Sequence, residues 1–126
     1  MAVAEREESA MTRSRIEIFE AMLKEQPEDA MVWYGLGSEY FRLERWGDAA
    51  DAFRKVVQYN PNYTAAYQLL GTALMNQERR DEARSVWAQG IEAATRAGAW
   101  KARQHMEGLL AETGGDSPSG FCSEQS

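Results

Sequence analysis

The chain has 126 residues, of which 44% are hydrophobic and 27% charged, which is typical of a single soluble globular domain. The net charge of −6 divides into −4 over residues 1–29, zero over 30–98 and −2 over 99–126, and basic residues alternate with acidic ones. This pattern argues against a nucleic-acid partner, and the absence of a long apolar run or signal peptide predicts a cytoplasmic protein with no membrane contact.

The N-terminal part of the chain predicts a flexible segment over residues 1–11 and then a helix over about 12–25. Ile16, Phe19 and Leu23 recur at helical spacing in that helix. Pro27 follows it and is expected to end it, because proline cannot continue a helix.

Four further helices are expected in the middle of the chain, over about 29–42, 46–59, 63–76 and 80–97. Pro27 and Pro61 lie in the linkers before the first and third of them, where Asp29 and Asn62 can cap the helix that follows. The other two connections are short enough to make neighbouring helices antiparallel.

A last helix is expected over 99–112, after a break at Gly98, and residues 113–126 are expected to be a disordered tail rich in glycine and serine. The only cysteine, Cys122, lies in that tail, so no internal disulfide is possible.

The middle of the chain contains an internal period of 34 residues. The first copy has, in order, Trp33, Leu36, Gly37, Tyr40, Ala49, Phe53 and Pro61. The second copy has, in the same register, Tyr67, Leu70, Gly71, Leu74, Ala83 and Trp87. This order follows the tetratricopeptide (TPR) signature W-x2-L-G-x2-Y, A-x3-F, P, so the chain resembles that family over residues 27–96.

The resemblance implies an all-α fold, an α-α superhelix of stacked helical hairpins. Two full repeats, 30–63 and 64–97, are expected between an N-terminal half-repeat helix at 12–25 and a C-terminal capping helix at 99–112. We expect Gly37 to face Ala49 and Gly71 to face Ala83, where small residues let two helices approach closely. All four tryptophans are assigned to the core or to seams between helices.

No group of residues predicts chemistry, and no enzyme activity, cofactor or metal is expected. Gly35-Leu36-Gly37 lacks the lysine and the preceding strand of a phosphate loop. His105 is the only histidine and has no partners for a catalytic triad or a metal site. Acid pairs such as Asp48/Asp51 are interpreted as exposed groups among arginines.

In proteins that this chain resembles, the first helix of each hairpin lines a concave groove that holds a peptide. The residues that this resemblance assigns to the groove are Tyr34, Ser38, Phe41, Arg42, Gln68, Thr72, Met75, Asn76 and Arg103. For Phe41 and Met75, packing and binding are equally good interpretations. Family members that bind a C-terminal carboxylate use a clamp of lysines, asparagines and an arginine there, and only Arg103 matches it.

These observations predict a non-enzymatic adaptor that binds an uncharged or partly apolar protein segment in the groove. Two alternatives stay open. One is a small chaperone that shields an apolar client segment, and the other is a scaffold that forms homo-oligomers through its unmatched half-repeats.

Overall fold

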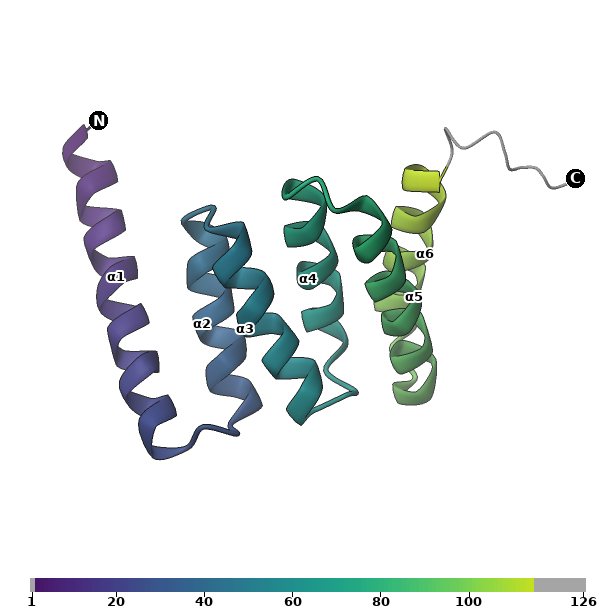
Figure 1. Cartoon of the computed structure of the whole chain (residues 1–126), viewed down its shortest axis with the longest axis horizontal. Coiled ribbons are helices and arrows are strands. Elements are labelled where there is room, and N and C mark those ends of the chain that lie inside the picture. Colours follow the sequence, from purple (N-terminus) through teal and green to yellow (C-terminus); the bar gives the residue numbers. More distant parts are fainter. Residues whose placement is uncertain (1, 115–126) are drawn as a thin grey trace, which may run out of the picture.

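The computed structural model describes residues 2–114, with side chains described from residue 10 onward, and this part of the chain contains six helices and no strand. The helices are α1 (Ala2–Glu25), α2 (Ala30–Arg42), α3 (Trp46–Tyr59), α4 (Thr64–Asn76), α5 (Arg80–Ala97) and α6 (Trp100–Gly114). They form a row in chain order, with α1 at one end and α6 at the other (Figure 1). The predicted all-α superhelix is confirmed.

Each helix packs mainly on its neighbours in the chain, as expected of hairpins joined by short connections. An additional contact joins α4 to α6. Because α4 also packs on α3 and α5, it is the most enclosed helix, and it has buried residues at Ala66, Tyr67, Leu70, Gly71, Ala73 and Leu74.

The helix boundaries follow local backbone chemistry. The Asp29 side chain caps α2 by accepting hydrogen bonds from the backbone N–H groups of Met31 and Val32. Asn62 does not cap α4 with its side chain; its Oδ1 accepts a hydrogen bond from Arg96 instead. The turns inside the two hairpins match, since Glu44 and Glu78, one repeat apart, both have left-handed backbone conformation with φ of 59° and 61°.

The largest difference from the expected boundaries is at the N-terminus. Helix α1 begins at Ala2, whereas a flexible segment was expected up to residue 11. The capping helix runs from Trp100 to Gly114 instead of 99–112, so Thr113 and Gly114 belong to it. The rest of the expected tail, residues 115–126 with Cys122, lies outside the described residues.

The close approach inside each hairpin involves a ring that the sequence analysis did not assign to it. A Cβ atom added at Gly37 would lie 2.8 Å from Cε1 of Phe53, and its three nearest atoms all belong to that ring, not to Ala49. At Gly71 the three nearest atoms all belong to the Trp87 indole. Glycine is therefore required because the following helix inserts an aromatic side chain against its Cα.

The core is continuous from α3 to α6, and its largest fully buried side chains include Phe53, Trp87 and Met106. The close packing of α6 on α5 depends on Gly90, because an added Cβ there would lie 2.5 Å from the Met106 sulfur and 2.6 Å from Cβ of Tyr67. Trp100 is the exception to the tryptophan assignment, because 59% of its surface is exposed.

Candidate functional site

The predicted groove residues of α2 divide into packed and exposed positions. Tyr34 stacks on Tyr63 at 4.9 Å between ring centroids, and Phe41 meets Trp46 edge to face at 4.9 Å. Both aromatic rings are partly buried and belong to the margin of the core. They therefore take part in packing, which leaves less of their surface free for a ligand.

The polar residues of α2 are oriented by their own helix. Ser38 donates its hydroxyl to the Tyr34 carbonyl at 2.8 Å, so its oxygen keeps only acceptor capacity for a ligand. Arg42 is exposed, and its Nε lies 3.6 Å from Oε1 of Glu39, a buried carboxylate that Arg15 of α1 approaches at the same distance.

A row of predicted groove residues follows one face of α4. Thr72 donates its hydroxyl to the Gln68 carbonyl, and Asn76 donates its amide to the Thr72 carbonyl. The Gln68 carbonyl also accepts the Trp87 indole N–H at 3.3 Å. Met75 is partly buried against the core. Asn76 is exposed, and Gln68 and Thr72 are partly exposed.

The last predicted groove residue, Arg103, lies on α6. Its guanidinium lies 5.8 Å from the Trp100 ring centroid and its Nε bonds Glu107 at 3.0 Å. Trp100 was not predicted as a surface residue, yet it is 59% exposed and lies beside the Arg103 guanidinium.

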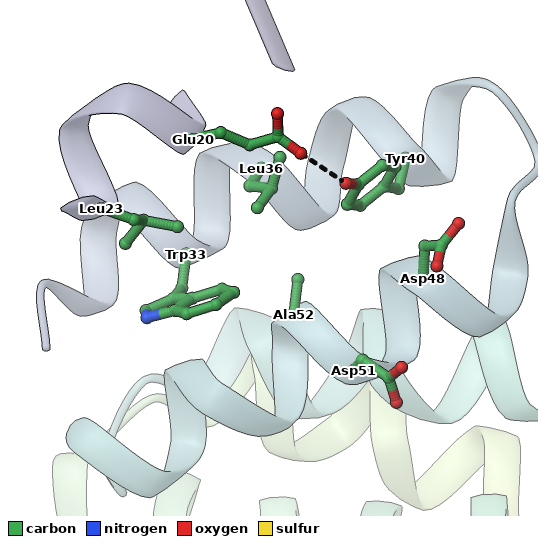
Figure 2. A pocket seen from close by; sticks show the side chains of 8 residues that line it. All are labelled: Glu20, Leu23, Trp33, Leu36, Tyr40, Asp48, Asp51 and Ala52. Atoms are coloured by element: carbon green, nitrogen blue, oxygen red, sulfur yellow. Dashed lines mark hydrogen bonds between the residues drawn. The ribbon is translucent and has the colours of Figure 1, made fainter. Parts of the chain in front are cut away.

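A cavity of about 370 Å³ lies elsewhere, and none of the nine predicted groove residues lines it. Its lining comes from α1, α2 and α3 and comprises Glu20, Leu23, Trp33, Leu36, Tyr40, Asp48, Asp51 and Ala52. Figure 2 shows Glu20 on one wall, directed toward Tyr40, with Asp48 and Asp51 on the wall that α3 forms. Leu36 lies two residues before the predicted groove residue Ser38, and Tyr40 lies two residues before Arg42. Two residues correspond to a rotation of about 200° around a helix, so the cavity and the predicted groove use opposite faces of α2.

The electrostatics of this cavity are acidic. Tyr40 donates its hydroxyl to Oε2 of Glu20 at 3.3 Å. Burial raises the pKa of Tyr40 above its ordinary value, and the Glu20 carboxylate raises it further, while Arg45 acts in the opposite direction. The Tyr40 hydroxyl therefore keeps its proton to higher pH than a free tyrosine does, and it donates a hydrogen bond to Glu20.

One feature of the sequence indicates this cavity, although the repeat signature, which concerns core positions, does not include it. Glu20 is 34 residues before Arg54, so the charge at this position reverses between the half-repeat helix and the first full repeat. A comparison of surface positions across the period, rather than of core positions alone, would have singled it out.

Neither metal nor membrane chemistry has support among the described residues. Within them, no three His, Cys, Asp or Glu side chains gather closely enough to hold a metal ion. None of the helices in residues 2–114 combines the length and the apolar character that a membrane span needs. His105 is exposed on α6.

Comparison with known proteins agrees with this fold. The tetratricopeptide repeat family model matches residues 40–106. A TPR repeat-containing protein of Pseudomonas aeruginosa is 32% identical over 95 residues, which cover 75% of this chain and 90% of that protein.

Two solved structures are similar as well. A protein of Bordetella parapertussis has a TM-score of 0.67 and 28% identity, over 78% of this chain and 85% of that one. The TPR2B domain of yeast Sti1, in complex with pHsp70, has a TM-score of 0.75 over 87% of this chain and 88% of that one; its 16% identity makes it evidence for the fold alone. TPR domains are generally protein-interaction modules and not enzymes. With its two repeats, its hairpin glycines and these relatives, the chain belongs to the tetratricopeptide repeat family.

Proposed function

We propose that this protein is a non-enzymatic adaptor that binds a segment of a partner protein along the groove of α2, α4 and α6. The observation that carries the proposal is the exposure pattern of α4. This helix packs on α3, α5 and α6, and it remains accessible to solvent along the row of Ala65, Gln68, Thr72 and Asn76. Such a row at helical spacing, on a helix otherwise enclosed, is a surface that the fold does not need for its own stability.

The chemistry of the groove favours an uncharged or partly apolar segment. Its two cations are paired inside the molecule, Arg42 near Glu39 and Arg103 with Glu107. The remaining groups are amides, hydroxyls and the exposed Met31, whose flexible thioether adapts to different ligands. The Sti1 domain, which shares the fold, is in complex with pHsp70, so this fold can hold a protein partner.

The test begins with capture of the partner by the full chain from its host, followed by measurement of affinity for groove variants. Tyr34 is a poor choice for substitution because it stacks on Tyr63. We expect the double substitution Gln68→Ala and Asn76→Ala to weaken binding by about 2 kcal/mol, since buried interface amides lose their hydrogen bonds. The matched control is Gln58→Ala with Gln89→Ala, two exposed glutamines on α3 and α5.

Equal affinities for the groove variant and the control variant would remove the groove from consideration. Affinity should also change little between low and moderate salt, because the groove is nearly neutral. The cytoplasmic location stays a prediction, which cell fractionation can test.

A second candidate, self-association, is favoured by the exposed face of α1. Ile18 and Met22 are 58% and 44% exposed, whereas their equivalents one repeat later, Ala52 and Val56, are 2% and 0% exposed. The exposed residues of α6 at the opposite end are mixed: Lys101, Gln104 and His105 are polar, whereas Trp100 is apolar. A dimer through paired α1 helices and end-to-end stacking of α1 on α6 are both forms to test. Ile18→Glu should convert a dimer into a monomer by light scattering.

A further inference from the structure

Helix α1 packs on the first full repeat much as α3 of that repeat packs on the second, and the difference between these two seams points to a second binding site. The first seam is the α1–α2–α3 cavity. The second seam has the equivalent positions, 34 residues later, on α3, α4 and α5. They are Arg54, Val57, Tyr67, Leu70, Leu74, Glu82, Ser85 and Val86.

In the second seam two arginines reach the acid. Glu82 bonds Arg79 at 2.7 Å within α5, and Arg54 reaches it from α3 at 3.5 Å. The larger Val86 and the smaller, uncharged Ser85 take the positions of Ala52 and Asp51. The internal repeat therefore shows which group fits beside an acid at this point of the fold, namely a guanidinium.

The first seam has the same acid and the same local partner but lacks the second guanidinium. Asp48 bonds Arg45 at 2.7 Å, in the same i, i+3 arrangement as Glu82 and Arg79. The position of Arg54 is taken by Glu20. Within the described residues, no ion pair joins Glu20 or Asp51 to a basic side chain. Three carboxylates thus line the cavity, and Arg45 pairs with one of them, Asp48.

The remaining lining is suited to a flat cation. Trp33 and Tyr40 contribute aromatic surface, and Leu23, Leu36 and Ala52 contribute aliphatic surface. The Arg45 guanidinium already lies over Tyr40, 4.7 Å from its ring centroid, and so demonstrates the interaction inside the molecule. Arginine combines stacking on aromatic rings with bidentate bonding to carboxylates, which the compact ammonium of lysine cannot do.

We propose that the α1–α2–α3 cavity binds the side chain of an arginine from a partner protein. The guanidinium takes the place that Arg54 has in the second seam, between Glu20 and the Asp48–Asp51 wall. A volume of about 370 Å³ admits one long side chain, and it lies near the lower limit of ordinary ligand pockets. This site is independent of the concave groove and uses the opposite face of α2.

The test uses an acetylated and amidated peptide, Gly-Ser-Arg-Ser-Gly, and the same peptide with citrulline in place of arginine. Citrulline keeps the shape and removes the charge. Binding to the full chain is followed by NMR, through the Trp33 indole N–H and the amides of Glu20, Tyr40 and Asp51. We expect saturable shifts at these residues at about millimolar concentration with the arginine peptide, weakening with added salt, and none with citrulline.

The decisive variant is Glu20→Arg, which places an arginine of the chain itself into the cavity, as Arg54 is placed in the second seam. It should abolish the shifts, and Glu20→Gln should weaken binding threefold or more. Glu17→Arg makes the same charge change at an exposed position of α1 that does not line the cavity, so it should bind as the parent does. The melting temperature of each variant shows that the fold persists.

Several results would overturn the proposal. They are the absence of saturable shifts with the arginine peptide, equal binding of the citrulline peptide, or unchanged binding by Glu20→Arg. If the same peptide with lysine in place of arginine binds as tightly as the arginine peptide, the site is not specific for arginine. If free arginine binds tenfold more tightly than the arginine peptide, the ligand of the cavity is the amino acid and not a protein side chain. Binding of the groove partner should be unaffected by Glu20→Arg, so failure of this site and failure of the groove are separate results.

Discussion

The two repeats of this protein are alike where they pack and different where they face solvent or a neighbouring helix. In each hairpin a glycine of the first helix meets an aromatic ring of the second, Gly37 with Phe53 and Gly71 with Trp87. At the seams, by contrast, Glu20 of the half-repeat helix α1 corresponds to Arg54 of the first full repeat. Positions that repeat are therefore those required by packing, and positions that do not repeat are the place to look for function.

The two repeats also end differently. The first continues through Val56 and Pro61 into another hairpin, whereas the second has Gly90 and Thr95 at these positions and continues to Gly98. Because Gly90 leaves space for Met106, helix α6 can pack closely on α5 and cap the array. The same fold position thus either propagates the array or closes it, depending on the size of one side chain.

The strongest test of this comparison is removal of the cap by ending the chain after Ala99. This exposes the surface around Gly90, Ala93 and Ala94 and loses Met106, which is fully buried. Burial of one such side chain is worth about 1.5–3 kcal/mol, a large share of the stability of a small domain. We expect loss of cooperative thermal unfolding by circular dichroism, or aggregation.

The matched control ends the chain after Gly114 and so removes only residues 115–126. It should melt as the parent does, because that segment is rich in glycine and serine. A monomer that lacks α6 and still melts cooperatively at the parental temperature would show that the second repeat needs no cap.

The next test concerns the hairpin glycines. Gly71→Ala places a methyl group against the Trp87 indole, which is only 1% exposed and has no room to move. We expect a loss of about 1–3 kcal/mol from overpacking, measured by urea unfolding. Gly37→Ala should cost less, because the Phe53 ring is smaller than an indole.

The control for this test is Gly108→Ala on α6, where an added Cβ would have no neighbour within 4 Å. Alanine there should stabilise the protein by about 0.5–1 kcal/mol, through its higher helix propensity. The two substitutions are chemically identical and opposite in expected sign. If both stabilise, the close contact inside the hairpin does not exist.

A smaller effect is expected from reversing the charge of the second seam. Arg54→Glu removes the ion pair with Glu82 and makes the second seam resemble the first. Both side chains are nearly half exposed, so solvent screens the pair and the expected loss of stability is at most about 1 kcal/mol. Replacement by glutamine separates repulsion from simple loss of the pair. A loss much larger than this would mean that the seam, and not the hairpin, holds the repeats together.

The smallest effect is expected at alkaline pH. Burial raises the pKa of Tyr67, although Arg96 lowers it, and Tyr67 donates its hydroxyl to the Pro61 carbonyl at 2.8 Å. The unfolded tyrosine loses its proton near its ordinary pKa of about 10, while the folded one retains it to higher pH. The unfolded state then binds fewer protons, so stability should fall as the pH rises above about 10.

Tyr67→Phe should reduce the steepness of this alkaline loss, while costing some stability at neutral pH through the lost hydrogen bond. Chemical unfolding at a series of pH values, for parent and variant, gives both quantities. Identical slopes above pH 10, about the ordinary tyrosine value, would show that Tyr67 is not the group responsible.

Much of the architecture could be predicted before the structure was known. The helices around residues 30–97 were placed to within about one residue, because proline linkers and capping residues act locally. The N-terminal boundary was wrong by ten residues, since no breaker precedes Thr12 and the helix continues back to Ala2. The nine groove residues remain predictions, and the structure adds that Tyr34 and Phe41 take part in packing.

The sequence by itself determined the helical repeat, its period and the positions that must be small or apolar, because these depend on spacing along one helix. Only the tertiary structure decided that Gly37 faces the Phe53 ring, that Trp100 is exposed and that a cavity with three carboxylates lies between α1 and α3. These features depend on how side chains from different helices fill the space between them. A helical period specifies which face a residue occupies, but the neighbouring helix determines what it meets there.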